Sequence, residues 1–529
     1  MPNRRAHYVL STHWDREWYQ PFQDYRFRLV NLWDHILAGM ESGELKGPFT
    51  TDGQAIILED YLEVRPERRA QLEKLAREGR LVIGPWYVLP DEFIVSGESI
   101  VRNLRWGRQV AREFGAQPSN AGFVCDIFGH NSQMPQIFAG LGVRGAFVWR
   151  GSNQIEQRHF TWRGADGTEL PTYRFGHVGY CSYCAYVRQA FDWKTPFDPE
   201  DTAERAEQFL DREAQATEVE PLLLFDGGDH QEWDAPAYNV LMEMGRRGQK
   251  GYDIVHSSLD AYLDDLLPQA GRISMVAEGE LREPGRDPVP TDQQWLIPGV
   301  LSSRVWIKQL NAACQTLLCL WAEPISAYAH AALGREYPQG YLNVAWQWLL
   351  KNHPHDSICG CSIDQVHEDM KYRFSQCQQI GERLTFEAGM DLAANIEGNL
   401  DADTFRATVF NPLPQALDET VELTLPIPQD WPQFNEWFGF EPKPAFRIYD
   451  ARGKEAAFQR VGQAMNRQKK RILPTRFAAT YRADDVTVSL RAKLPALGYT
   501  TLTVKKGEAG SPTRHPAVPG LATSERSME

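Results

Sequence analysis

The sequence of 529 residues predicts an α/β N-terminal domain with a mainly parallel sheet, followed by a three-helix bundle and a small β-sandwich domain. Three observations predict this order: short apolar runs alternate with longer helical patterns up to about residue 265, long helical patterns follow from about residue 300, and strand-like alternation begins near residue 406. The predicted boundaries are 1–282 for the α/β domain, 283–299 for a Pro- and Gly-rich linker, 300–400 for the helical bundle, 401–506 for the β-sandwich domain and 507–529 for a disordered tail.

The apolar runs of the first domain are short and continuous, as is typical of parallel strands that are covered on both faces. They lie at 8–10, 81–83, 122–125, 146–149 and 222–225. Amphipathic helical patterns lie between them, at 58–78, 99–114, 203–213 and 237–248. This strand–helix alternation indicates an α/β fold.

The later regions have different periodicities. Long helices are predicted at 301–333, 341–352 and 364–397, with apolar residues at helical spacing such as Trp306, Leu310 and Leu317. Strands are predicted at 406–412, 421–425, 486–492 and 499–504. The end of the chain is polar and contains Gly, Pro and Ser, which favours disorder.

The bulk composition excludes several classes of protein. A formal net charge of −14 argues against a nucleic-acid partner, which usually requires a basic face. No apolar stretch is long enough to span a membrane, and the first residues do not resemble a signal peptide. Without a signal peptide, the 8 Cys residues are expected to be reduced thiols of a cytoplasmic protein. A four-sulfur zinc site from Cys181-x-x-Cys184 and Cys359-x-Cys361 is an alternative, although the flanking residues lack the turns of zinc knuckles.

Polar groups follow most of the predicted strands of the first domain. The active sites of parallel α/β folds lie at the carboxyl ends of their strands, so these groups are candidates for a common site. For any single one of them, a charge on a surface loop is the alternative. They are His13, Asp15, Asp126, Arg150, Asp226 and Asp229.

Four of the candidates could bind a divalent metal. His13 and Asp15 are two residues apart after the first strand, and Asp126 ends a buried strand. The segment from His353 to Asp356 adds two histidines, His353 and His355, so that His13, Asp15, Asp126 and one of these histidines would make a nitrogen and oxygen set suited to zinc. His130 is an alternative ligand, and an N-cap is the alternative role of Asp126.

Three segments resemble the signatures of glycoside hydrolase family 38, the α-mannosidases. They are His13-x-Asp15-x-x-Trp18, Asp126-x-Phe128-Gly129-His130, and His355-Asp356-Ser357-Ile358-x-Gly360. The order of these segments and of the predicted domains is also similar. The continuation Gln133-Met134-Pro135 and the histidine segment are most similar to the bacterial branch, which includes mannosylglycerate hydrolases.

The resemblance implies a metal centre with one Zn²⁺ per chain. His13, Asp15 and His355 match zinc ligands of the family, and Asp126 matches a residue that is both zinc ligand and catalytic nucleophile. His353 is the less favoured ligand, because the family pattern places the ligand immediately before an aspartate.

The resemblance also implies residues that act on or bind the sugar. Asp229 is the candidate acid/base, preferred to Asp226 because a Gly-x-Asp followed by a polar residue is closer to the family pattern. Arg150 resembles an arginine that contacts the nucleophile, and Asp356 matches a residue that binds sugar hydroxyls. The aromatic residues Trp18 and Trp86 complete the substrate-binding set. For Trp86, a position in the hydrophobic core is an equally good explanation.

The function implied by the resemblance is that of a zinc-dependent retaining α-mannosidase, which acts on terminal α-D-mannosyl residues of oligosaccharides or small mannosyl conjugates. Such an enzyme holds two carboxyl groups roughly 5–5.5 Å apart on either side of the bond that it cleaves. The alternatives are a metal-dependent carbohydrate deacetylase, which uses metal-bound water, and a mannoside-binding fragment with impaired catalysis.

The resemblance carries two expectations about the whole protein. Family members extend well beyond this length, so the chain is expected to be C-terminally truncated, with an apolar face exposed. A homo-oligomer is compatible with the family, and an α-mannoside is the expected partner, with neither nucleic acid nor membrane.

Overall fold

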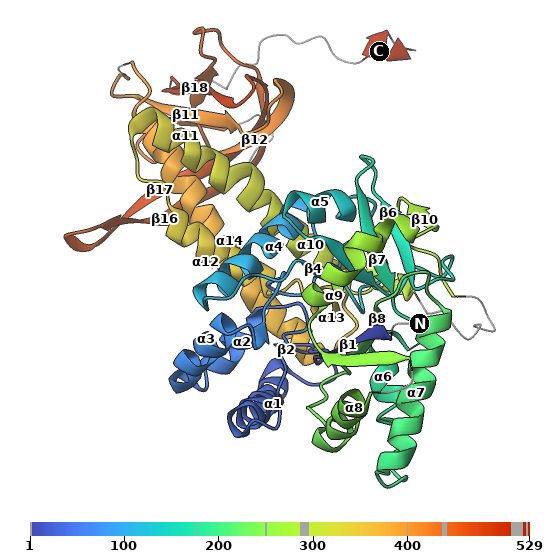
Figure 1. Ribbon diagram of the computed structural model, residues 1–529. Helices are drawn as coiled ribbons and strands as arrows, with labels where there is room; N and C mark the ends of the chain where they lie inside the picture. Colours follow the sequence, from blue (N-terminus) through green and yellow to red (C-terminus); the bar gives the residue numbers. More distant parts are fainter. Residues whose placement is uncertain are drawn as a thin grey trace. The chain divides into compact units, whose positions relative to one another are not determined.

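The computed structural model describes residues 3–528 except 177, 249–250, 286–295, 399, 436–441, 509–521 and 525–526 (Figure 1). The chain divides into two compact units. The first contains Met1–Gln315 and Gly340–Ile380, and the second contains Thr316–Gln339 and Gly381–Glu529. Each unit is described separately below.

The first unit contains a sheet of five parallel strands. Their order is β3-β2-β1-β8, and β9 also pairs with β1. The central strand β1 is buried over its last five residues, and all of β8 is buried, as expected for continuous apolar runs. The strands are β1 (Arg4–Leu10), β2 (Phe49–Thr50), β3 (Leu81–Val82), β8 (Leu222–Asp226) and β9 (Tyr252–His256).

A second five-stranded sheet completes the strands of this unit, in the order β10-β6-β7-β5-β4. Strands β4, β5 and β7 are parallel to one another, whereas β6 runs antiparallel to β7. The prediction of a mainly parallel α/β domain is therefore confirmed. The strands are β4 (Ala121–Phe123), β5 (Gly145–Val148), β6 (His159–Arg163), β7 (Glu169–Arg174) and β10 (Val276–Glu278).

The helices of the first unit begin at recognisable caps. Ser96, Asp198, Asp234 and Ser258 each accept a hydrogen bond from a backbone N–H of the first turn that follows. The helices are α1 (Phe22–Ser42), α2 (Ile56–Leu62), α3 (Arg69–Arg77), α4 (Gly97–Glu113), α5 (Met134–Gly140), α6 (Ser182–Tyr186), α7 (Pro199–Gln215), α8 (Ala235–Arg247) and α9 (Leu259–Leu266). Short 3₁₀ segments are η1 (Pro66–Arg68), η2 (Gly179–Cys181), η3 (Leu267–Arg272) and η4 (Pro298–Leu301).

One predicted helix is divided in the structure. The pattern at 58–78 predicted a single helix, but α2 ends at Leu62 and α3 begins at Arg69. Pro66 lies between them at the start of η1. Because proline has no N–H and disfavours the helical conformation of the residue before it, the helix cannot continue through this position.

Long helices form the middle region, as predicted. The helical stretch 305–333 is uninterrupted and consists of α10 (Val305–Thr316), a π-helical segment η5 (Leu317–Ala322) and α11 (Glu323–Leu333). It is followed by α12 (Gln339–Leu350), the short α13 (His355–Ile358) and α14 (Asp364–Ala394). Helix α14 contributes residues to both units.

Antiparallel β-structure ends the second unit, as predicted. One sheet has the order β11-β18-β15 and another the order β12-β17-β16. Both contribute to one hydrophobic core, which includes Ile427, Ile448, Val486, Val488 and Val504. The strands are β11 (Thr404–Asn411), β12 (Leu417–Pro428), β15 (Phe446–Tyr449), β16 (Phe458–Leu473), β17 (Arg476–Leu494) and β18 (Gly498–Lys506).

Two short strand pairs complete the described secondary structure. The pairs are β13 (Gln433–Phe434) with β14 (Lys443–Pro444), and β19 (Ala522–Ser524) with β20 (Ser527–Met528). Most of the predicted linker 283–299 and of the predicted tail 507–529 lies outside the described residues, and the domain boundaries stay predictions. Among the helices that the structure describes, none has the length and hydropathy needed to cross a lipid bilayer.

Candidate active site

The ends of five parallel strands supply most of the candidate site, all within the first unit. His13 and Asp15 follow β1, and backbone hydrogen bonds join this segment to the one after β8: the N–H of His13 donates to the carbonyl of Gly228, and the N–H of His230 donates to the carbonyl of His13. Asp126 follows β4. The carboxyl ends of parallel strands meet at one edge within each sheet, and the segments that follow the two sheets come together where His13 contacts Asp126. Asp52 after β2, Arg150 after β5 and Asp229 after β8 belong to the same set.

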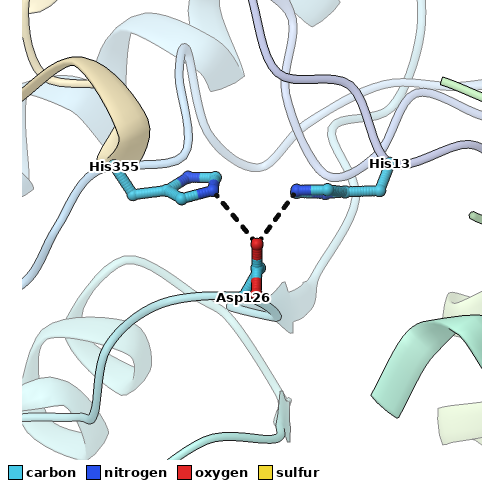
Figure 2. A group of neighbouring side chains, drawn as sticks. All are labelled: His13, Asp126 and His355. Atoms are coloured by element: carbon cyan, nitrogen blue, oxygen red, sulfur yellow. Dashed lines mark ion pairs between the residues drawn. The ribbon is translucent and has the colours of Figure 1, made fainter. Parts of the chain in front are cut away.

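Two imidazoles and two carboxylates form the centre of the site. Figure 2 shows the rings of His13 and His355 pointing at the same oxygen of Asp126. The Nε2 atoms of His13 and His355 lie 3.7 and 3.5 Å from Oδ2 of Asp126. They lie 3.1 and 3.3 Å from Oδ1 of Asp15. The four residues that the sequence proposed as metal ligands are therefore brought together.

The donor atoms of this cluster suit a bound cation. Nε2 of His13, Nε2 of His355 and Oδ1 of Asp15 are buried and have no hydrogen-bond partner among the described residues. Buried polar atoms are normally hydrogen-bonded, so three neighbouring ones that lack a hydrogen bond are consistent with a site for a ligand. Nitrogen and carboxylate oxygen donors in this number match zinc, and His13, Asp126 and His355 each offer a ligand atom within 4.8 Å of the others.

A second layer of contacts orients the two imidazoles. Nδ1 of His13 lies 3.1 Å from Oδ2 of the fully buried Asp52. Nδ1 of His355 faces the backbone carbonyl of Leu89 at 3.4 Å. A carboxylate or carbonyl on one ring nitrogen fixes the tautomer and leaves the other nitrogen to bind a metal. Burial lowers the pKa of His13, but the charges of Asp52 and Asp15 outweigh it and raise the pKa overall.

Asp126 is held in an unusual conformation beside an arginine. Its φ of 65° lies in the left-handed region, which non-glycine residues adopt rarely and which is often found at functional sites. Arg150 donates from Nε to Oδ1 of Asp126 at 2.8 Å, and a second bond comes from its terminal nitrogen. Burial raises the pKa of Asp126, but Arg150 and then His355 outweigh it and hold the pKa well below its usual range. The Asp126 carboxylate keeps 14% of its surface exposed, so a substrate can reach it.

The structure separates the two candidates for the acid/base. Asp226 is buried, accepts a hydrogen bond from the hydroxyl of Tyr8 at 2.7 Å and forms an ion pair with Arg188 at 2.8 Å. Asp229 is exposed to solvent and accepts a hydrogen bond from the hydroxyl of Tyr180 at 2.9 Å. Partial desolvation raises the pKa of Asp229, with Asp126 adding to the rise and His13 opposing it.

The segment from His355 to Ser362 is anchored to the segment after β1. Oε1 of the buried Glu17 accepts hydrogen bonds from the hydroxyl of Ser357 at 2.8 Å and from Arg373 of α14 at 2.6 Å. Asp356 is buried next to this anchor, and together with Asp15 and His355 it offers ligand atoms within 4.8 Å of one another. Burial, followed by the charge of Asp15, raises the pKa of Asp356.

The two tryptophans occupy different environments. Trp18 is half-buried, packs on Tyr19 at 4.9 Å between ring centroids, and accepts a hydrogen bond at its carbonyl from the N–H of Ile363. Trp86 is fully buried, and its indole N–H donates to the carbonyl of Phe123 at 2.9 Å. This is the environment of a core tryptophan, the alternative that the sequence left open for Trp86.

The other candidate ligands lie outside the cluster. Nε2 of His353 lies 2.8 Å from the side-chain oxygen of Asn311, and Nδ1 of His130 lies 2.8 Å from Glu92. The two cysteine pairs do not combine into a four-sulfur site in the described part of the chain. The pair Cys181 and Cys184 lies near Asp229, and the pair Cys359 and Cys361 lies near Asp356.

Sequence reasoning missed several contributors. Asp52 follows a two-residue strand, too short to be recognised, although Thr-Asp-Gly after an apolar Phe is a strand-end signal of the kind used for Asp126. Tyr180 lies in a 3₁₀ turn without periodicity, and its ring packs on His13 at 4.5 Å. Glu17 and Arg373 are 356 residues apart, so no local pattern could have paired them.

Comparisons with known proteins agree with this geometry. Residues 3–281 match the family model described as "Glycosyl hydrolases family 38 N-terminal domain", and residues 296–392 match "Alpha mannosidase middle domain". A crystal structure of an alpha-mannosidase from Enterococcus faecalis V583 superposes with a TM-score of 0.84 at 29% identity, covering 97% of this chain and 57% of that one.

Sequence relatives give the same assignment. The "Putative mannosylglycerate hydrolase" of Halalkalibacterium halodurans is 33% identical over 419 residues, which are 76% of this chain and 44% of the relative. Alpha-mannosidase 2C1 of Homo sapiens is 25% identical over 411 residues, which are 74% of this chain and 35% of the relative. The chain thus spans less than half the length of either relative. It belongs to glycosyl hydrolase family 38.

Proposed function

We propose that the chain is a zinc-dependent retaining α-mannosidase that hydrolyses terminal α-D-mannosyl residues of oligosaccharides or small mannosyl conjugates. The observation that carries the proposal is that Nε2 of His13 and Nε2 of His355 both face the carboxylates of Asp126 and Asp15, with Asp229 on the adjoining segment. Membership of a glycosidase family supports the reaction class.

One Zn²⁺ per chain would be held by His13, Asp15, Asp126 and His355. When bound, it would act as a Lewis acid toward hydroxyl groups of the mannose ring. The carboxylates of Asp15 and Asp126 offset its charge, and Asp52 keeps His13 in the orientation that binding requires.

Asp126 is the proposed nucleophile. Its low pKa keeps the carboxylate charged, because Arg150 stabilises the anion through two hydrogen bonds to Oδ1. Those bonds leave Oδ2 as the oxygen that faces the imidazoles. Attack of this carboxylate on the anomeric carbon would form the glycosyl-enzyme of a retaining mechanism.

Asp229 is the proposed acid/base. Its raised pKa favours the protonated form, which a general acid needs at the start of the reaction. Protonated Asp229 would donate to the oxygen of the leaving group, and the resulting carboxylate would then take a proton from the water that attacks the glycosyl-enzyme. The hydroxyl of Tyr180 orients its carboxyl group.

Asp356, Trp18 and Trp86 are the remaining proposed contributors to substrate binding. Asp356 lies in the same group of ligand atoms as Asp15 and His355, where its carboxyl group could accept hydrogen bonds from sugar hydroxyls. Trp18 is partly exposed and could present a ring face to the sugar. The burial of Trp86 suits a supporting role beneath the site, at the carbonyl of Phe123. The cysteine usage of the sequence supports a cytoplasmic location.

The test is release of nitrophenol from nitrophenyl α-D-mannoside by the purified 529-residue chain. We expect activity that disappears on chelation, returns with Zn²⁺, and is absent from Asp126→Asn. Turnover that survives complete removal of metal would contradict the metal dependence. Zinc and mannose binding without any turnover would contradict the proposed activity and indicate an impaired mannoside-binding fragment.

A further inference from the structure

Two thiols that have no role in the proposed mechanism lie beside Asp356. Sγ of Cys359 and Sγ of Cys361 are 3.1 Å apart, and Sγ of Cys361 is 3.5 Å from Oδ1 of Asp356. The three side chains each offer a ligand atom within 4.8 Å of the others. Cys359 is fully buried, whereas Cys361 is exposed and gives solvent access to the group.

The turn that brings the two thiols together is held in place. Gly360 between them has a φ of 82°, a conformation that glycine adopts without strain. Its carbonyl accepts hydrogen bonds from the hydroxyl of Ser303 at 2.9 Å and from Nε of Arg304 at 3.0 Å. The carbonyl of Cys359 accepts one from Nζ of Lys308 at 2.7 Å. These hydrogen bonds therefore hold the backbone of residues 359–361 in place without a bound ligand.

The distances fit a tetrahedral metal with sulfur and oxygen ligands. Zn–S bonds of about 2.3 Å and Zn–O bonds of about 2.1 Å place two sulfurs about 3.8 Å apart, and a sulfur and an oxygen about 3.6 Å apart. The sulfur–oxygen distance between Cys361 and Asp356 already matches at 3.5 Å. The two sulfurs have to separate by about 0.7 Å from 3.1 Å, which rotation of the exposed Cys361 side chain can provide.

We propose that Asp356, Cys359 and Cys361 form a second metal site, which binds a thiophilic d¹⁰ ion such as Zn²⁺ or Cd²⁺ and competes with the sugar for Asp356. Thiolate donors select soft ions, which distinguishes this site from the nitrogen and oxygen cluster around Asp126. Binding releases the thiol protons to solvent, and a water molecule completes the coordination. No electron transfer is involved.

The expected consequence is inhibition by excess metal. A carboxylate that is bound to an ion at Cys359 and Cys361 cannot accept hydrogen bonds from the sugar. This consequence rests on the proposed function, in which Asp356 binds sugar hydroxyls. The proposal of the metal site itself does not rest on that function, because it is argued from the three ligand atoms alone.

The other cysteine pair provides a matched comparison. Cys181 lies 3.6 Å from Oδ1 of Asp229, and Sγ of Cys184 points to the carbonyl of Cys181 at 3.1 Å. In the described part of the chain, this pair does not belong to a group of three potential ligands. Asp229 is close to Cys181, but the three side chains do not place their ligand atoms all close to one another, so this pair should bind a metal ion much more weakly.

The test is a titration of the reduced 529-residue chain with Cd²⁺, followed by the ultraviolet charge-transfer band of cadmium–thiolate bonds. We expect the band to saturate at about one Cd²⁺ per chain, to be lost in Cys361→Ser and to persist in Cys184→Ser. In the unmodified chain, Cd²⁺ should also protect the Cys361 peptide from alkylation, as measured by mass spectrometry. An absent band, or a band that is unchanged in Cys361→Ser, would overturn the proposal.

A second readout separates the site from its effect on catalysis. Excess Zn²⁺ should inhibit hydrolysis of nitrophenyl α-D-mannoside by the unmodified chain and by Cys184→Ser, but not by Cys361→Ser. Equal inhibition of all three proteins would refute competition for Asp356. If the chain did not hydrolyse mannosides at all, the proposed function would fail, while the absorbance titration would still decide whether the site exists.

Discussion

Replacing Asp52 with asparagine should weaken metal binding without touching a metal ligand. Asp52 is fully buried, and its carboxylate lies 3.1 Å from Nδ1 of His13. The same carboxylate accepts hydrogen bonds from the N–H of Trp14 at 2.8 Å and from the side-chain amide of Gln54 at 2.9 Å. Asparagine has nearly the same shape but presents an NH₂ group in place of one oxygen. One of the three N–H donors around this side chain, from His13, Trp14 or Gln54, must then face the NH₂ group of the asparagine, which is itself a donor.

The size of the effect follows from the role of the carboxylate. Loss of a partner that orients a metal-binding histidine typically costs 10–100-fold in metal affinity, or about 1.4–2.7 kcal/mol. We expect the upper part of this range for Asp52→Asn. Burial removes any water that could replace the lost bond, and the substitution also removes a negative charge beside the imidazole of His13.

The assay is competition for Zn²⁺ between the chain and a chromophoric chelator, which needs no enzymatic activity. Asp226→Asn is the control, because it also neutralises a buried carboxylate at a strand end, but one paired with Tyr8 and Arg188. We expect the dissociation constant to rise in Asp52→Asn and to stay unchanged in Asp226→Asn. Equal constants for folded Asp52→Asn and the unmodified chain would refute the proposed orientation of His13.

The remaining predictions concern stability and proton transfer. Arg373→Ala should lower the free energy of unfolding by about 3–5 kcal/mol, measured by denaturant titration, because it leaves the buried carboxylate of Glu17 without its partner; a loss below about 1 kcal/mol would show that the anchor is not needed. Asp229→Ala should slow substrates with poor leaving groups far more than activated ones, and equal slowing of both would exclude Asp229 as the acid. Asp226→Asn should lower the free energy of unfolding, because the ion pair with Arg188 is lost, but it should not change the ratio of the rates on activated substrates and on substrates with poor leaving groups. Because the pKa of Asp229 is raised, its acid form persists to higher pH; the rate on poor leaving groups should fall as pH rises through that pKa, and the fall should be missing in Asp229→Ala.

The periodicity of the sequence predicted the regular helices and strands, but not the places where the chain departs from a regular pattern. The continuous apolar run at 222–225 became the buried strand β8, and the pattern at 99–114 became α4, because both patterns are local. The helix predicted at 58–78 was divided at Pro66, where steric exclusion outweighs amphipathic periodicity. Strand β2 has only two residues, too few for any periodicity to show, whereas the equally short β3 lies within the apolar run predicted at 81–83.

The candidate site was predictable where a residue type and a strand end coincide. His13, Asp15 and Asp126 were predicted in this way, and the resemblance to a known family selected His355 over His353 as a fourth residue; the structure places the side chains of His13, Asp126 and His355 close together. The groups that position these residues could not be found, since the partner of each is set by tertiary structure. Asp52 supports a histidine 39 residues away.

The central claim is that Asp126 serves as nucleophile in a retaining mannosidase. The most direct measurement is incubation of the 529-residue chain with an activated fluoro-mannoside that forms a long-lived glycosyl-enzyme, followed by peptide mass spectrometry. The account predicts one mannosyl adduct, on the peptide that contains Asp126, which is absent from Asp126→Asn. An adduct on a different carboxylate, or turnover of α-mannosides with inversion at the anomeric carbon, would contradict it.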